Sequence, residues 1–205
     1  DPSQTPALNR GAADWHADFF RECKAHGREL VVASSMELVL APDELPARYH
    51  DSTPVITDVG FGSDLWSAHC AFNAPTLSYQ KKVFAHITDL MAEAGLTPEI
   101  QFGEYCWWYF SSKTDGTMAL YDEDTKAAAR LALNGNDLAI FKSADDDPSI
   151  NGGADARFLR QRLHDHVASL VAYIRDRHPN TRFEVLFPYD VNYPTPAGKR
   201  GLGGR

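Results

Sequence analysis

The chain has 205 residues, of which 43% are hydrophobic, and its 20 basic against 28 acidic residues give a formal net charge of −8. This charge repels nucleic-acid phosphates and anionic membrane surfaces, and the sequence contains no basic patch that would offset it. The length suits one sizeable domain with a hydrophobic core, and no apolar run approaches the roughly 18 residues of a membrane-spanning helix.

Hydrophobic periodicity predicts helices and strands that alternate along the chain. The first half is predicted to contain a helix over 10–26, a strand over 30–36, a loop over 41–54, a short strand over 54–58, a loop over 60–72 and a helix over 73–94. The second half is predicted to contain a strand over 99–104, a helix over 123–133, a strand over 137–141, a helix over 158–177 and a strand over 182–188. This alternation indicates βαβ units and a parallel sheet.

The two ends of the chain are predicted to lie outside this domain. Residues 1–9 are polar and contain proline, which suits a leader segment, and residues 195–205 form a glycine-rich tail or linker. The domain itself is predicted to span 10–194. A first residue other than methionine and the glycine-rich end indicate a piece of a longer protein.

Three of the predicted strands end in an acidic residue, namely Glu37, Glu104 and Asp190. Because the C-terminal ends of parallel strands converge on one face of a sheet or barrel, these carboxylates are expected to share a site. Two carboxyl groups are what glycoside hydrolysis needs, one as acid and the other as nucleophile or base. The pattern predicts a sugar site with Glu104 as its strongest member, although a carboxylate at a strand end can also be a helix cap or an arginine partner.

An aromatic run, Trp107, Trp108 and Tyr109, follows Glu104 closely. Aromatic surface can raise the pKa of a neighbouring acid by excluding water, and an indole ring packs well on the apolar face of a sugar. These three residues are therefore candidates for substrate binding. The alternative is that they fill the hydrophobic core.

No metal or cofactor is predicted. Cys23, Cys70 and Cys106 are too widely spaced for a metal knuckle and are expected to be buried free thiols. His164 and His166 stand two apart on a helix, so they face different directions, and both are expected at the surface. The acidic segment 145–152 lacks the glycine and glutamate of a calcium-binding EF-hand and is expected to be a solvated loop.

Six stretches of the sequence together resemble a known domain. The resemblance is to the TIM-barrel domain of phage non-contractile tail sheath proteins, which is itself similar to glycoside hydrolase barrels. Its most specific blocks are QFGE-x-x-WW and FP-x-DVNYP. The six stretches are VVASSMEL (31–38), TPVITDVGFGSDLWSAHCAF (53–72), AGLTPEIQFGEYCWWYF (94–110), MALYDEDT (118–125), DDDPSINGGADARFLRQRLHDHV (145–167) and HPNTRFEVLFPYDVNYP (178–194).

The resemblance implies an α/β fold of the (β/α) TIM-barrel type in a virion tail protein that assembles with other copies of itself in a ring around the tail tube protein. Glu37 would match an acid/base position and Glu104 a nucleophile position, with Asp190 and Asn192 lining the same cleft. His69 and Tyr121 are further candidates for substrate binding. Because a full barrel takes about 250 residues, the barrel is expected to be incomplete or fragmentary.

Three interpretations of function stay open at this point. The first is a structural sheath component with a glycosidase-like cleft that binds a glycan. The second is an active glycosidase that uses Glu37 and Glu104 on host-surface polysaccharide, in which case it would act outside the cell. The third is an ordinary α/β core without a site.

Overall fold

The structure is a computed structural model, and it describes residues 7–58, 66–107, 118–142 and 153–186. These residues form two compact units. The first comprises the described residues up to Ser34 with Leu77–Gly103 and His166–Leu186, and the second comprises those of Ser35–Thr76 and Glu104–Asp165. No helix in this part of the chain is long and apolar enough to cross a bilayer.

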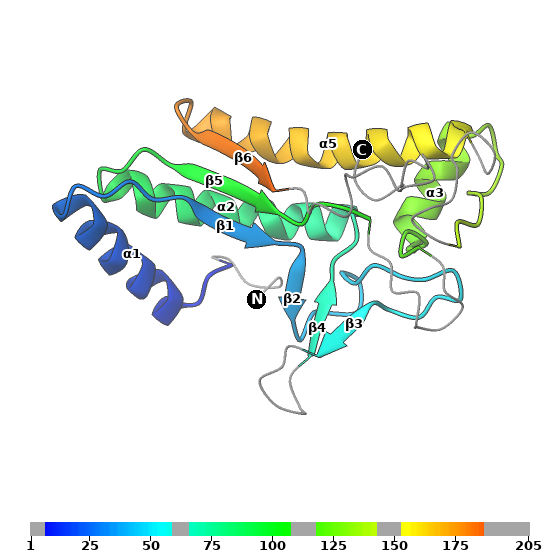
Figure 1. Cartoon of the computed structure of the whole chain (residues 1–205), viewed down its shortest axis with the longest axis horizontal. Helices are drawn as coiled ribbons and strands as arrows, with labels where there is room; N and C mark the ends of the chain where they lie inside the picture. The colour runs from blue at the N-terminus through cyan, green and yellow to red at the C-terminus, as the bar shows by residue number, and fades with distance from the viewer. Residues whose placement is uncertain (1–6, 59–65, 108–117, 143–152, 187–205) are drawn as a thin grey trace, which may run out of the picture. The chain divides into compact units, whose positions relative to one another are not determined.

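The first unit is built around a sheet with the strand order β1, β5, β6. Strands β5 and β6 pair in parallel from Glu99↔Arg182 to Gly103↔Leu186, and Figure 1 shows β1 pointing the same way. The strands and the helices that contribute to this unit are β1 (Val32–Ser35), β5 (Glu99–Gly103), β6 (Arg182–Leu186), α1 (Arg10–Ala25), α2 (Ala74–Glu93) and α5 (Gly153–Arg177). This arrangement confirms the predicted mixed α/β class with a parallel sheet.

The core of the first unit lies between the sheet and helix α2. Phe102 of β5 is fully buried, with its ring edge-on to Phe84 of α2 at 5.4 Å between centroids and stacked on Phe183 of β6 at 5.7 Å. Because side chains alternate along a strand, the neighbouring residue of β5 points to the other face. There Gln101 donates a hydrogen bond to Glu184 at 2.8 Å.

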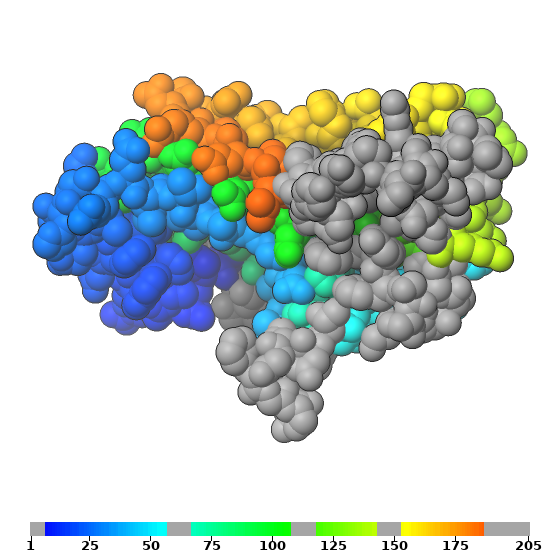
Figure 2. Space-filling view, in the orientation of Figure 1, coloured from blue at the N-terminus to red at the C-terminus, as the bar shows by residue number. Residues whose placement is uncertain are grey.

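The sheet does not close into a barrel within the described residues. Strand β6 lies at one edge of the sheet, and its Val185 and Leu186 are 42% and 48% exposed. The orange atoms of β6 are visible at the surface in Figure 2. This agrees with the expected partial barrel.

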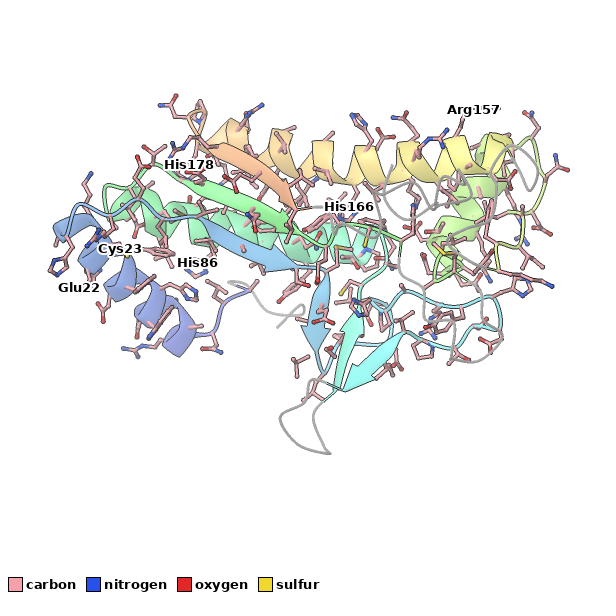
Figure 3. All side chains as sticks on the ribbon, viewed as in Figure 1. Glu22, Cys23, His86, Arg157, His166 and His178 are labelled. Carbon is pink, nitrogen blue, oxygen red and sulfur yellow. The ribbon has the colours of Figure 1, made fainter. Side chains whose placement is uncertain are left out.

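Helices α2 and α5 are joined in the first unit by polar contacts at two places. His166 of α5 is 5% exposed, and its Nε2 lies 2.7 Å from Oε1 of Gln80. The prediction of a surface residue at His166 is therefore wrong, because its helical position turns it toward α2, whereas His164 is exposed as expected. Figure 3 labels His166 partway along α5 and His178 just after its end, where His178 and Arg177 both contact Asp89 of α2.

The second unit contains an antiparallel sheet with the order β2, β4, β3. Its strands are β2 (Glu37–Val39), β4 (Trp66–His69) and β3 (Ile56–Asp58), with helix α3 (Glu123–Ala132) following later. The sequence analysis placed 66–69 in a loop, and that prediction is wrong. A four-residue strand is too short to show a clear alternation, and it forms here because β2 and β3 pair with it on both sides.

The predicted strand over 137–141 is also absent from the described structure, because side chains bind its backbone where a neighbouring strand would. The hydroxyl of Tyr121 donates to the carbonyl of Ala139 at 2.9 Å and accepts from the amide of Phe141 at 2.6 Å. The carboxylate of Asp155 accepts from the amide of Ala139 at 2.7 Å. The amide of Met118 also donates to the carbonyl of Phe141 at 3.0 Å, but this single backbone bond does not make 137–141 a strand.

Asp122 forms the N-cap of α3 by accepting from the amide of Thr125 at 3.0 Å. Its other carboxylate oxygen is buried and has no hydrogen-bond partner among the described residues. Burial raises the pKa of Asp122 above its ordinary 3.8, even though the bonds from Thr125 act in the opposite direction. Protonated Asp122 therefore stabilises the folded chain. This contribution to the free energy of unfolding is fully present below pH 3.8 and is lost as the pH rises through the raised pKa.

Replacing Asp122 by asparagine and by alanine tests this cap. Asparagine keeps the accepting oxygen and cannot ionise, so Asp122→Asn is expected to gain stability relative to the native chain as the pH rises from 3 to 7. The free energy of unfolding of Asp122→Ala is expected to be about 1 kcal/mol lower than that of Asp122→Asn, because the N-cap of α3 is lost. Urea denaturation at several pH values measures both differences, and a constant gap between Asp122→Asn and the native chain would contradict the pKa argument.

Candidate functional site

The carboxylates of Glu37 and Glu104 come from the ends of different strands and belong to the second unit. β1 ends at Ser35, and β2 begins at Glu37 after the single buried residue Met36. Glu104 directly follows the last residue of β5. Glu37 is therefore the first residue of β2, whereas the sequence analysis predicted it only as the residue that follows the strand over 30–36.

One serine hydroxyl connects the two glutamates. The Oγ of Ser35 donates to Oε2 of Glu104 at 3.2 Å and accepts from the backbone amide of Glu37 at 3.0 Å. Glu104 is partly buried and Glu37 is exposed. The sequence analysis did not name Ser35, and the only signal available was a hydroxyl residue two positions before a candidate glutamate.

The carboxylate of Glu37 is also held by His69, its cross-strand partner in the β2–β4 ladder. Nε2 of His69 lies 3.1 Å from Oε1 of Glu37, and the imidazole side chain is only 2% exposed. Burial lowers the pKa of His69 to about 4. The imidazole is therefore neutral at neutral pH, and the contact is a hydrogen bond donated to the carboxylate rather than an ion pair.

The backbone at Glu104 is strained. Its φ of 58° lies in the left-handed region that residues with a side chain avoid. The amide of Cys106 donates to the carbonyl of Glu104 at 2.9 Å and closes the turn. Strain of this kind persists where the surrounding structure enforces it, and it concentrates at functional sites.

The aromatic residues behind Glu104 are packed inside the unit. Trp107 is 3% exposed and meets Phe72 edge-on at 4.8 Å, and Tyr105 is fully buried. Nε1 of Trp107 is buried without a hydrogen-bond partner among the described residues. Burial also raises the pKa of the Cys70 thiol to about 12, so this cysteine is not a thiolate nucleophile.

The other predicted site residues fall into two groups. Tyr121 is 2% exposed, and its hydroxyl is engaged with the backbone of 139–141. Asp190, Asn192, Trp108 and Tyr109 lie outside the described residues. No group of three or more His, Cys, Asp or Glu side chains within the described part of the chain is placed to hold a metal ion. The described site therefore consists of Glu37 and Glu104 together with Ser35, which bonds to both, and His69, which contacts the carboxylate of Glu37.

Comparison with protein-family models matches residues 2–189 to the model described as the non-contractile tail sheath protein TIM barrel. The chain belongs to this family. No curated protein and no solved structure matches it. The family places this tail sheath domain in the tail of a phage virion, and the match confirms the resemblance found in the sequence.

Membership of the tail sheath family agrees with the parallel sheet of the first unit. The three described parallel strands carry their C-terminal ends on the same side, as strands of a TIM barrel do. The antiparallel sheet β2–β4–β3 lies in the segment that joins β1 to α2 in sequence. In a TIM barrel, the segments that follow the strands carry the functional residues, and Glu37 and His69 stand in such a segment.

Proposed function

We propose that this tail sheath domain has a structural role in the virion tail, assembled with other copies of itself in a ring around the tail tube protein, and that Glu37 and Glu104 bind a glycan. Membership of the family supports the structural role. The observation that carries the glycan site is the single hydroxyl of Ser35 between the two glutamates. Carboxylate oxygens accept hydrogen bonds from sugar hydroxyls, and Ser35 ties the carboxylate of Glu104 to the backbone amide of Glu37.

The proposed site includes further residues besides this pair. Asp190, Asn192, Trp108 and Tyr109 would add polar and aromatic contacts to the sugar. Trp107, Tyr121 and His69 are buried, so they would support the site without touching the sugar. His69 would do so through its contact with the carboxylate of Glu37. No metal or cofactor is needed for this mode of binding.

Glycoside hydrolysis is a second candidate, which the presence of two glutamates next to strand ends favours. Retaining glycosidases hold their two carboxyl groups about 5–5.5 Å apart. In that mechanism Glu104 would attack the anomeric carbon while Glu37 protonates the leaving oxygen, and water would then release the sugar from Glu104. Such an enzyme would act on host-surface polysaccharide outside the cell.

Replacing Glu104 by glutamine tests both candidates. Cellohexaose, maltohexaose and chitohexaose are titrated into the full-length protein by calorimetry, and Glu104→Gln is expected to weaken binding at least about tenfold through loss of a charged acceptor. The matched control is Glu93→Gln, an exposed glutamate at the end of α2 that should bind like the native protein. Equal binding by Glu104→Gln and the native protein would contradict the proposed site.

Release of reducing ends in the same samples separates binding from hydrolysis. Turnover by the native protein that disappears in Glu104→Gln would favour the glycosidase, whereas binding without turnover would favour a glycan-binding structural domain. Electron micrographs of the full-length protein test the structural role independently. Rings are expected, and a monomer under all conditions would count against the assembly.

A further inference from the structure

We infer that Ser35 is a positioning residue that holds the carboxylate of Glu104 beside the backbone of Glu37. This inference rests on the proposed glycan site and adds a residue to it. A serine hydroxyl has one hydrogen to donate and two lone pairs to accept with. An ionised carboxylate can only accept and an amide N–H can only donate, so the contacts at 3.2 Å to Glu104 and 3.0 Å from Glu37 fix the direction of both bonds.

The position of Ser35 is itself held firmly by the chain that follows it. Met36 is 1% exposed, and its carbonyl accepts from the amide of Cys70 at 2.7 Å. Glu37 is then paired with His69 both across the β2–β4 ladder and through its carboxylate. The hydroxyl of Ser35 therefore projects from an anchored backbone, which is what a group that orients another side chain requires.

The backbone of Glu104 shows why such a group is needed. A residue held at a φ of 58° has an unfavourable conformation that the surrounding structure must enforce. The turn bond from Cys106 fixes the main chain of Glu104, and among the described residues Ser35 donates a side-chain hydrogen bond to its carboxylate. Without the hydroxyl, the carboxylate would still leave the strand end at the same place but would sample several side-chain rotamers.

Ser35 acts through the two glutamates, so its effect should depend on Glu104. Ser35→Ala removes the hydroxyl and little else, and it is expected to weaken binding of the hexasaccharide probes about fivefold, the effect of one lost hydrogen bond. Ser35→Thr keeps the hydroxyl and should bind within about twofold of the native protein. In the Glu104→Ala background, Ser35→Ala should cause no further loss, because the side chain that the hydroxyl orients is gone.

A measurement without glycan separates this inference from the proposed function. Hydrogen exchange of the Glu37 amide, followed by NMR in the full-length protein, should be about tenfold faster in Ser35→Ala and unchanged in Ser35→Thr, since the amide loses its acceptor only in the first. If Ser35→Ala does not fold, as judged by circular dichroism, Ser35→Cys replaces it, because a thiol has a similar size but bonds weakly.

Three outcomes would overturn the inference. They are unchanged hexasaccharide affinity in Ser35→Ala, a full additional loss when it is combined with Glu104→Ala, and unchanged exchange of the Glu37 amide. If none of the hexasaccharides binds the native protein, the glycan site is overturned and Ser35 loses its role in it. The exchange rate then still decides whether the hydroxyl holds Glu37, so the two failures are distinguishable.

Discussion

Replacing Phe102 by alanine is expected to lower the free energy of unfolding by about 3–5 kcal/mol, the largest effect that we predict for a single substitution. The ring is fully buried and lies between Phe84 of α2 and Phe183 of β6. Its removal leaves a cavity where sheet and helix meet, and neither neighbour can fill that cavity without leaving its own packing. Urea denaturation followed by circular dichroism measures the loss.

The control for Phe102 is the same substitution at an exposed phenylalanine. Phe19 of α1 is 40% exposed; it stacks on the exposed Trp15 at 5.1 Å and lies tilted to Phe20 at 6.3 Å. Phe19→Ala should cost less than about 1 kcal/mol, as surface substitutions generally do. Similar losses for the two variants would mean that the contact between β5 and α2 does not stabilise the unit as the structure indicates.

The second large effect is expected at Asp89, which joins α2 to the end of α5. Oδ2 of Asp89 accepts from Arg177 at 2.6 Å and Oδ1 contacts Nε2 of His178 at 2.7 Å. The Asp89 side chain is 33% exposed, so two charge-assisted bonds at this depth should contribute about 2 kcal/mol, between the values for surface and buried pairs. Asp89→Ala is expected to lose that amount at pH 7.

The dependence of this loss on pH follows from the pKa of Asp89. Burial alone would raise that pKa, but the hydrogen bonds from His178 and Arg177 outweigh it and hold the pKa below its ordinary 3.8. The contribution is therefore present above the ordinary value and disappears as the pH falls through the lowered one. Urea denaturation of Asp89→Ala and the native chain from pH 7 to pH 3 should show the gap narrowing at the acid end.

Asp176→Ala is the matched control for Asp89. Asp176 is exposed on α5 and makes no ion pair or hydrogen bond of its side chain within the described residues. Its replacement should change stability by no more than about 0.5 kcal/mol at any of these pH values. A loss at Asp176 equal to that at Asp89 would show that net charge, rather than the specific bonds to Arg177 and His178, is responsible.

The sequence was sufficient for those parts of the fold that carry a long periodic pattern. Helices α1, α2 and α3 and strands β5 and β6 stand within a few residues of their predicted bounds, because each presents a continuous apolar face or a buried run. The antiparallel sheet was missed, because strands of three or four residues form from pairing with neighbours that lie elsewhere in the sequence. The segment 137–141 was taken for a strand because it is apolar, yet side chains of Tyr121 and Asp155 make most of the described hydrogen bonds to its backbone.

The candidate site could be predicted only in part. The position of Glu37 and Glu104 near strand ends was visible in the sequence, because an acidic residue after an apolar run stands out. Ser35 could not be singled out, because its role depends on a hydrogen bond to a residue 69 positions away. The burial of His69 also escaped prediction, since it depends on how distant segments pack around it, whereas the burial of Trp107 matches the alternative that it fills the core.

The buried imidazole of His69 also affects how this domain tolerates acid. The pKa of His69 is 6.5 in an unfolded chain and about 4 in the folded domain. At a pH between these values, His69 is protonated in the unfolded chain and neutral in the folded one. Protonation of His69 therefore favours the unfolded chain throughout that range. The free energy of unfolding falls as the pH decreases, and the affected residue lies in the ladder between β2 and β4. In a tail that enters an acidic environment, this domain would be less stable against unfolding, and the loss would arise at the strand pair that carries Glu37.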